Sequence, residues 1–274
     1  FGGTSSGAGP LIELHDNLKD LFSSKIGELI TSVDIVDIEN LIGRCVVSGN
    51  VRRSAALALG EHDDFRYLEM KNDQEKLYHH RWGSNNSYAA HVGMEYSWHA
   101  NQTQENGEPG TIWLENARAY GRFKDGINYD DAEVVGFNPC VEQSLHNAEM
   151  CCLVETFPAK HDDYDDYVRT LKCAYLYGKT VTLVNTHWPE TNAKMLKNRR
   201  IGLSQSGIVQ AFKKHGRRNL LEWSDKAYDH VRKLDTEYSN WLCVPRSIKV
   251  TSIKPSGTVS LLNGSTPGIH FPED

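Results

Sequence analysis

An alternation of strand-like and helix-like patterns runs through the second half of this chain and most constrains its fold. Apolar runs typical of strands occupy residues 151–157, 180–184, 201–204 and 249–253. Helical periodicity occupies residues 164–177, 190–200, 208–215 and 220–234. Alternation of this kind is typical of parallel sheets covered by helices, and it predicts an α/β architecture.

The first half of the chain is less regular. A loop of small residues at 2–10 leads into a helical pattern, and a second amphipathic helix is expected over 32–47, ending at Ser48-Gly49-Asn50. A short buried strand is expected at 55–59. Residues 72–136 are polar and irregular and predict a loop-rich stretch, although 111–120 is compatible with one helix. No repeat, low-complexity tract or linker divides the chain.

Bulk properties limit the class of protein. At 274 residues with 39% hydrophobic residues, the chain is long enough for one large domain or two smaller ones. A mean hydropathy of -0.53, with no apolar run of membrane length and no signal pattern, predicts a soluble cytoplasmic protein without membrane contact. The net charge of -6 gives no general attraction for nucleic acid. The basic stretches at 197–200 and 213–218 either meet phosphates or form solvated helix faces.

The six cysteines are irregularly spaced and include no pair of C-x-x-C motifs, so neither a disulfide framework nor a zinc site is expected. His79-His80 has no partner at metal-ligand spacing either, and no metal site is predicted. Cys45, Cys173 and Cys243 stand among apolar neighbours and are expected to be core residues.

One segment carries chemistry, and it reads Asn138-Pro139-Cys140-Val141-Glu142. The proline stiffens the approach to a thiol that has an amide two positions before it and a carboxylate two positions after it. In an extended segment these three side chains would share one face. A second thiol, Cys151, follows eleven positions after Cys140 at the head of an apolar strand.

Together these features resemble the active-site segment of ribonucleotide reductases. Residues 33–55, 198–207 and 254–260 are similar to further segments of the same family. The resemblance implies an α/β barrel of about ten strands with a central finger loop that carries Cys140 at its tip. It also implies that residues 1–274 are part of a single catalytic barrel domain. Because the chain starts at Phe1 without Met and stops at Asp274, we expect a fragment whose N-terminal and C-terminal parts are missing.

The resemblance assigns a role to each residue of the segment. Cys140 would carry a thiyl radical that abstracts the ribose 3'-hydrogen, and Glu142 would act as general base on the 3'-hydroxyl. Asn138 would hold the ribose hydroxyls. Cys151 would be one of two thiols that supply electrons and become a disulfide. Its partner would lie upstream of this chain and the thiols that re-reduce the pair downstream, so the chain is not expected to turn over alone.

Two binding segments follow from the same resemblance. A turn rich in glycine and hydroxyls that opens a helix would bind the substrate phosphates, because its backbone N–H groups and helix dipole favour an anion. The residues of this phosphate site would be Ser256, Gly257, Thr258, Val259 and Ser260, with Thr4 and Ser5 as a second wall. The loop that communicates with a deoxynucleotide effector would comprise Ser48, Gly49, Asn50, Val51, Arg52, Arg53 and Ser54.

The sequence at 151–158 and Val141 most resemble the adenosylcobalamin-dependent reductases of ribonucleoside triphosphates. That subtype implies adenosylcobalamin as cofactor, a thioredoxin-like reductant and a monomer that needs no iron-bearing subunit. No residues that would hold the corrin can be named from the sequence.

Other readings remain open. A glycyl-radical enzyme has a related barrel with a radical cysteine, but it leaves Glu142 unexplained and needs a glycyl loop that is not visible here. A catalytically silent nucleotide-binding module would keep the phosphate loops without any need for Cys140 and Glu142. Cys140 could also be an ordinary loop thiol, and residues 254–260 an ordinary helix cap.

Overall fold

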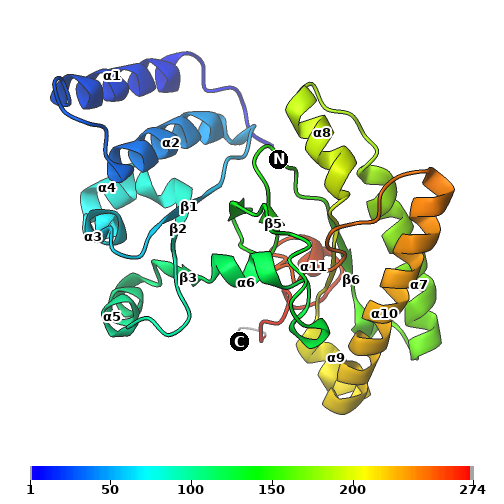
Figure 1. Cartoon of the computed structure of the whole chain (residues 1–274). Helices are drawn as coiled ribbons and strands as arrows, with labels where there is room; N and C mark the ends of the chain where they lie inside the picture. The colour runs from blue at the N-terminus through cyan, green and yellow to red at the C-terminus, as the bar shows by residue number, and fades with distance from the viewer. Residues whose placement is uncertain (1, 272–274) are drawn as a thin grey trace. The chain divides into compact units, whose positions relative to one another are not determined.

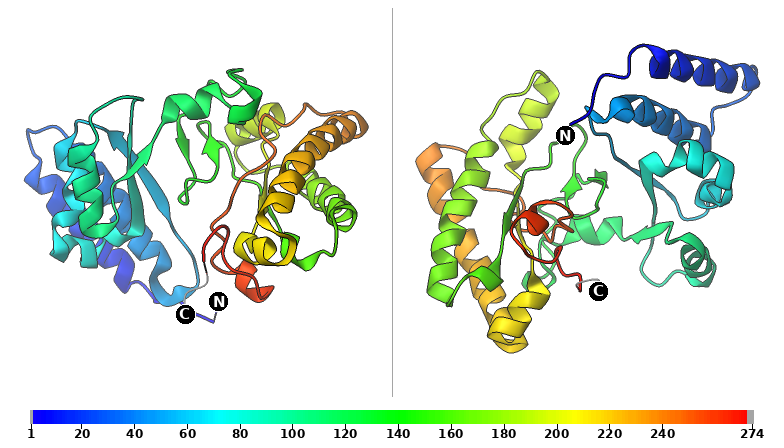
Figure 2. Two further views of the ribbon diagram at one scale, coloured as in Figure 1. Left: turned by 90° about the horizontal axis from the view of Figure 1, so that it is seen from below. Right: turned by 180° about the vertical axis from the view of Figure 1, so that it is seen from behind.

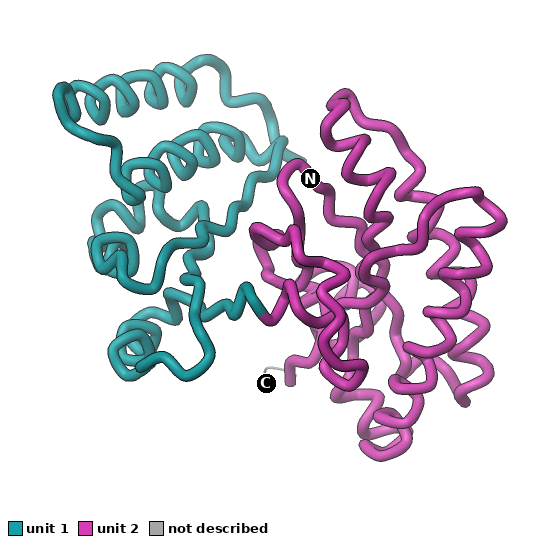
Figure 3. The backbone as a smooth tube through the Cα atoms, in the orientation of Figure 1, with its two compact units in different colours: residues 1–115 teal, residues 116–274 magenta. Residues whose placement is uncertain are grey.

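The computed structural model describes residues 2–271 of the chain. The chain divides into two compact units, Phe1–Glu115 and Asn116–Asp274 (Figure 3). The prediction that residues 1–274 belong to a single barrel domain stays a prediction.

The first unit is built on a parallel three-stranded sheet in the order β1-β2-β3 (Figure 1). Its strands are β1 (Ala56–Glu61), β2 (Ser84–Ala89) and β3 (Gly110–Ile112). Its helices are α1 (Gly9–Ser24), α2 (Ser32–Val47), α3 (Phe65–Leu68), α4 (Gln74–His79) and α5 (Ser97–Asn106), with short 3-10 turns η1 (Ser48–Asn50), η2 (Met70–Asn72) and η3 (Arg81–Gly83). The helix α6 (Leu114–Ala119) spans the boundary between the units.

Local sequence explains the limits of α2. Thr31 and Asp34 form a capping box, in which each side chain accepts a hydrogen bond from the backbone N–H of the other residue. The helix ends at Val47, as predicted, and Gly49 follows with a positive φ of 73°. Tyr67 of α3 is buried, and its hydroxyl lies within hydrogen-bonding distance of the carbonyl oxygens of Ala58 (2.7 Å) on β1 and Ser87 (2.9 Å) on β2.

The second unit contains a parallel pair and an antiparallel hairpin (Figures 1 and 2). The parallel pair is β6 (Leu153–Thr156) and β7 (Gly202–Gln205), and the hairpin is β4 (Gly136–Phe137) and β5 (Ser144–Leu145). The helices and turns are α7 (Tyr164–Val181), α8 (Pro189–Asn198), α9 (Ile208–His215), α10 (Arg217–Leu242), α11 (Val259–Leu262), η4 (Phe123–Asp125) and η5 (Pro158–Lys160).

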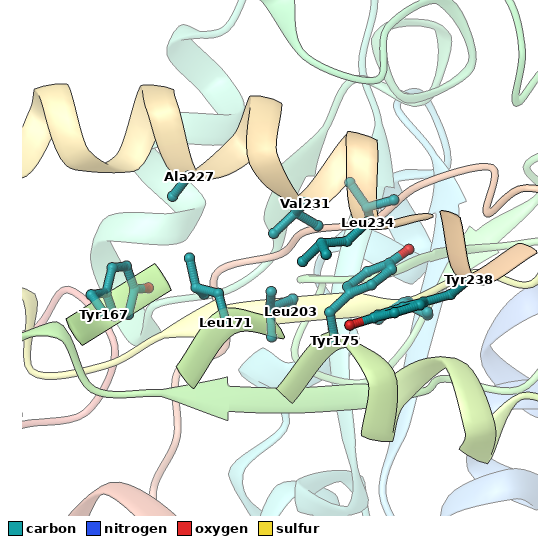
Figure 4. Packing of buried hydrophobic residues seen from close by; sticks show 10 residues of the cluster. Tyr167, Leu171, Tyr175, Leu203, Ala227, Val231, Leu234 and Tyr238 are labelled. Atoms are coloured by element: carbon teal, nitrogen blue, oxygen red, sulfur yellow. The ribbon is translucent and has the colours of Figure 1, made fainter. Parts of the chain in front are cut away.

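Helices α7 and α10 cover one face of the β6–β7 pair. Their apolar residues recur three or four positions apart and so share one side of each helix. The resulting core consists of Tyr167, Leu171 and Tyr175 from α7, Ala227, Val231, Leu234 and Tyr238 from α10, and Leu203 from β7 (Figure 4). Val154 of β6 packs against this core, so its neighbours Leu153 and Glu155 point to the opposite face of the sheet.

The parallel α/β architecture is as predicted, but three local predictions are wrong. Residues 180–184 are not a strand, because α7 continues through Val181 with Lys179 buried one turn after Tyr175. Residues 111–120 are not one helix, since β3 ends at Ile112 and α6 begins at Leu114. The stretch 72–136 is not loop-rich, and it contains α4, β2, α5, β3 and α6.

Strand β2 escaped the sequence analysis because its buried side chains are polar. Ser84, Asn86 and Ser87 are all buried and gave no apolar pattern. Hydrogen bonds compensate for their burial: Asn40 donates to the Ser84 hydroxyl (3.1 Å), which donates to the Asn86 amide oxygen (2.9 Å).

The segment expected as a strand at 249–253 runs parallel to β7 but forms only one bridge, between Leu203 and Thr251. Two backbone hydrogen bonds of 3.1 Å join Leu203 to Val250 and to Ser252. Within residues 2–271, no helix has both the length and the apolar character needed to cross a membrane.

Candidate functional site

The predicted active-site segment forms the turn of the β4–β5 hairpin, which we call the finger hairpin (136–145). Asn138 closes the turn, because its N–H donates to the Gln143 carbonyl (3.1 Å) and its Oδ1 accepts from the Gln143 N–H (2.9 Å). Val141, at φ 65°, donates its N–H to the Asn138 carbonyl (2.9 Å). The extended conformation considered for this segment is therefore wrong. Cys140 lies in the tight turn and is exposed.

Charge interactions connect Cys140, Glu142 and Cys151. Burial raises the pKa of the Cys140 thiol, the Glu142 carboxylate raises it further, and Lys254 lowers it. Burial, followed by Glu142, raises the pKa of Cys151 to about 12, with smaller contributions from its neighbours Cys152 and Cys140. One oxygen of Glu142 is buried and has no hydrogen-bond partner among the described residues. The Glu142 carboxylate in the turn therefore raises the pKa of both thiols, Cys140 and Cys151.

The raised pKa values determine what these thiols can do. A thiol whose pKa lies well above neutral stays protonated, and a protonated thiol is a weak nucleophile and a weak metal ligand. It keeps its S–H bond, which is the bond needed for donating or exchanging a hydrogen atom. Both thiols therefore keep their S–H bonds at neutral pH.

The two adjacent cysteines have different surroundings. Cys151 interacts with Glu142 and Cys140, whereas the pKa of Cys152 is raised by burial and by Glu149. Cys152 is 7% exposed, and its carbonyl accepts a hydrogen bond from Gly202 N–H (2.8 Å).

The core positions predicted for three other thiols are wrong. Cys45 is only partly buried, while Cys173 and Cys243 are exposed. Cys173 lies two residues from both Leu171 and Tyr175 on α7, and two helical positions turn a side chain to nearly the opposite face. The apolar residues that flank Cys173 in the sequence therefore point to the opposite face of α7.

Glu155 is a candidate functional residue that was not predicted from the sequence. It lies on β6, and both of its carboxylate oxygens are buried without a hydrogen-bond partner among the described residues. Lys254 Nζ lies 3.5 Å from Glu155 Oε2, and Lys254 also acts on both thiols. An available signal was the single carboxylate inside the apolar run 151–157, because a buried charge is costly without a compensating partner.

The predicted phosphate segment forms a compact turn. The Lys254 N–H donates to the Ser204 hydroxyl (2.7 Å), which joins the segment to β7. Ser256, at φ 56°, accepts at its hydroxyl from the Ser260 N–H (3.1 Å). Ser256 and Ser260 are buried, and residues 257–259 are exposed. The helix that follows, α11, has only four residues, so its dipole is smaller than the sequence suggested.

The remaining predicted residues belong to the first unit. Thr4 lies against the loop after α2, since a Cβ on Gly49 would be 2.1 Å from the Thr4 carbonyl oxygen. The hydroxyls of Ser6 and Ser48 are 2.8 Å apart. The structure therefore brings the 3–6 segment, which includes Ser5, together with the start of the predicted effector loop. Residues 49–54 of that loop are exposed.

Among residues 2–271, no cluster of histidine, cysteine and carboxylate side chains could hold a metal ion. His80 instead lies 3.0 Å from the Asp37 carboxylate in a buried ion-pair group.

Relatives with assigned names match the whole chain. The sequence is 50% identical to an adenosylcobalamin-dependent ribonucleoside-triphosphate reductase from Euglena gracilis, over 100% of this chain and 38% of that protein. It is 42% identical to the protein of the same name from Lactobacillus delbrueckii subsp. bulgaricus, over 99% of this chain and 40% of that protein. The chain belongs to the ribonucleotide reductase family.

Solved structures agree with this family assignment. A B-12-dependent, class II ribonucleotide reductase superposes on 99% of this chain with a TM-score of 0.90 and 39% identity, and the match covers 41% of that chain. The class Id ribonucleotide reductase α subunit of Actinobacillus ureae shares the fold with a TM-score of 0.60 over 84% of this chain, at 17% identity. The predicted reductase-type α/β barrel fold, present here in part, is confirmed. No family model matches the sequence.

This reductase segment spans about two-fifths of the length of the relatives that it matches. The resemblance to the adenosylcobalamin-dependent subtype is confirmed by the names of these relatives.

Proposed function

We propose that the protein containing this chain reduces ribonucleoside triphosphates to 2'-deoxyribonucleoside triphosphates by thiyl-radical chemistry. The observation that carries the proposal is the tight turn of the finger hairpin, which presents the exposed Cys140 thiol two residues from Glu142, whose buried oxygen has no hydrogen-bond partner among the described residues. The similarity to reductases of this name over the whole chain supports the substrate class.

The residues of the group divide the reaction between them. As a thiyl radical, the sulfur of Cys140 takes the hydrogen from C3' of the ribose and later returns it. Glu142 accepts the proton of the 3'-hydroxyl, and its buried oxygen without a partner is available for that bond. The 2'-hydroxyl takes a proton from one of the thiols and leaves C2' as water. Cys151 and a second thiol outside this chain supply two electrons and two hydrogens and become a disulfide.

Asn138 is proposed to orient the ribose hydroxyls through its amide nitrogen, because its Oδ1 is engaged by the Gln143 N–H. Adenosylcobalamin, when bound, supplies the initial radical that converts the Cys140 thiol into a thiyl. The Cys140 thiol is exposed in the turn of the finger hairpin and keeps its S–H bond, so it fits a cofactor that removes a hydrogen atom from it. No residue of this chain is assigned to the corrin.

The binding partners are part of the proposal. Exposed residues 257–259, with Ser256, Ser260, Thr4 and Ser5, are proposed for the substrate phosphates, and residues 48–54 for the response to a deoxynucleotide effector. We further propose that the protein is a cytoplasmic monomer and that a thioredoxin-like protein reduces it.

Electron paramagnetic resonance on the longer protein tests the proposal. Wild type and Cys140→Ala are each mixed with adenosylcobalamin, an effector deoxynucleotide and a reductant. A coupled cobalt–thiyl signal that requires Cys140 is expected. Reduction that proceeds only with an added metal-radical subunit would overturn the cobalamin assignment. Nucleotide binding with neither signal nor reduction would favour a silent binding module.

A further inference from the structure

A buried carboxylate lies at the base of the finger hairpin. Asp131 is 2% exposed and precedes β4 in the chain. Its two oxygens are surrounded by donors from four other residues. These are Arg200 Nη1 (2.6 Å) and Nη2 (2.7 Å), His146 Nε2 (2.8 Å), Lys249 Nζ (3.0 Å) and Ser144 Oγ (3.2 Å).

A second carboxylate completes this group. The Arg200 guanidinium is fully buried, and its Nη2 lies 3.0 Å from Glu149 Oε2. The same oxygen accepts a hydrogen bond from the backbone N–H of His146 (2.8 Å). Glu149 Oε1 accepts one from the Asn198 side chain (3.0 Å). We call these residues the Asp131 network, comprising Asp131, Ser144, His146, Glu149, Asn198, Arg200 and Lys249.

The charges of the network are matched inside the protein. Burial alone would raise the pKa of Asp131, but Arg200 and Lys249 outweigh it and hold that pKa below its usual value. Burial lowers the pKa of Lys249, although Asp131 opposes that shift. Burying such ions costs several kcal/mol each, and an apolar core of equal volume is often as stable. Stability alone therefore does not explain the network.

The position of the network beside the finger hairpin indicates a role in holding that hairpin in place. The finger hairpin has only two residue pairs, Gly136↔Leu145 and Phe137↔Ser144. A hairpin this short is not stable by itself in water. The network is linked to both arms, because Asp131 lies in the turn five residues before β4 and Ser144 lies in β5. It joins them to Arg200 before β7 and to Lys249 before the bridge at Thr251.

We propose that the Asp131 network is the positioning device that fixes the turn carrying Cys140 and Glu142 on the β6–β7 sheet. The effect of this network on the reaction rate rests on the proposed function, whereas the anchoring of the hairpin does not. Its members are positioning residues, since they act on the thiol only through the hairpin backbone. Radical transfer between a thiol and a ribose carbon depends steeply on distance, so small displacements of this turn lower the rate.

The test compares two variants of the longer protein that contains this chain. Asp131→Asn keeps the shape of the side chain but leaves Lys249 without its carboxylate and Arg200 with Glu149 alone. Asp235→Asn is the matched control, because Asp235 is 1% exposed and its Oδ1 lies 2.7 Å from Lys179 Nζ, far along the chain from the hairpin. Both variants are expected to lose stability, since each leaves a buried cation unpaired.

The deciding measurement is the alkylation rate of each cysteine by iodoacetamide, followed by mass spectrometry. Asp131→Asn is expected to accelerate the alkylation of Cys140 by about tenfold, since a mobile turn hydrates the thiol more fully and separates it from Glu142. The exposed Cys173 serves as the internal reference, and Asp235→Asn should leave Cys140 unchanged. Equal rates at Cys140 in wild type and Asp131→Asn, or equal acceleration by both variants, would overturn the proposal.

Ser144→Ala provides a milder variant if Asp131→Asn does not fold. It removes a hydroxyl that lies 3.1 Å from Arg200 Nη1 and 3.0 Å from Lys249 Nζ, and a smaller acceleration of Cys140 is expected. Alkylation requires neither cobalamin nor nucleotide. Acceleration in a protein whose wild type shows no reductase activity would therefore reject the proposed function and keep the anchoring role.

Discussion

At the scale of single residues, the environment of Cys151 determines a measurable pH dependence. Its folded pKa of about 12 lies above the ordinary thiol value of 9.0, mainly because of burial and then because of Glu142. A group whose pKa is raised by folding contributes stability that is complete below pH 9.0 and is lost as the pH rises toward 12. Cys151→Ala should therefore flatten the fall in unfolding free energy over this range, measured by urea denaturation. Parallel slopes in both proteins would contradict this.

Gly49 is a second residue whose role can be tested. Its φ of 73° disfavours any Cβ, and a Cβ would also meet the Thr4 carbonyl oxygen at 2.1 Å. Gly7 has a similar φ of 72° with no atom near a Cβ, so it is the matched control. We expect Gly7→Ala to cost about 1 kcal/mol and Gly49→Ala about 2–3 kcal/mol in chemical denaturation. Equal losses would mean that residues 3–6 do not pack on the loop.

At the scale of elements, an ion pair joins α2 to the turn η3. Asp37 of α2 accepts from Arg81 Nε (2.6 Å) and Nη2 (2.7 Å), and His80 Nε2 lies 3.0 Å away. Burial raises the pKa of Asp37, but these partners outweigh it and lower the pKa from 3.8 to about 2. The stabilisation is therefore present above pH 3.8 and is lost as the pH falls toward 2.

Asp37→Asn should destabilise the first unit by about 3–5 kcal/mol near neutral pH, because Arg81 is left buried without its counter-charge. Thermal unfolding followed by circular dichroism measures this, and acid unfolding of the variant should lose its steepness below pH 3.8. Glu39→Gln, on the exposed side of the same helix, is the control and should change little. Similar losses in both variants would reject a specific role for the pair.

At the scale of the whole molecule, the outer face of α1, opposite α2, is an exposed apolar surface. None of its residues is buried, and Leu11, Ile12 and Phe22 are 51%, 60% and 49% exposed. The matched relatives are more than twice as long as this chain. We expect segment 1–274, expressed alone, to bind the dye ANS more strongly per mole than the longer protein does, because large exposed apolar patches bind such dyes or partners.

The substitution Ile12→Lys in the segment should lower that ANS fluorescence, whereas Lys19→Ala on the same helix should not. Fluorescence from the segment that is no higher than that of the longer protein, or that does not respond to Ile12→Lys, would show that α1 is not the apolar surface in question.

Features that depend on short-range order could be predicted from the amino-acid sequence alone. Periodicity along the chain predicted the parallel α/β class and the helices near 164–177 and 208–215, because side-chain spacing decides which face of an element is buried. The turn with Cys140 was identified because its proline, thiol and carboxylate are consecutive in the chain. The resemblance to ribonucleotide reductases rested on the same local segments.

Features that depend on residues far apart in the sequence became visible only in the folded chain. Asp131 and Arg200 are 69 positions apart, and nothing in either local sequence indicates that they meet. Polar strand β2 and the exposed Cys173 were mispredicted for the same reason, since local composition does not reveal hydrogen-bond partners or the helix face that turns inward. Burial and pairing of polar groups are properties of the packed molecule, because only packing decides which charges lose water and which partners replace it.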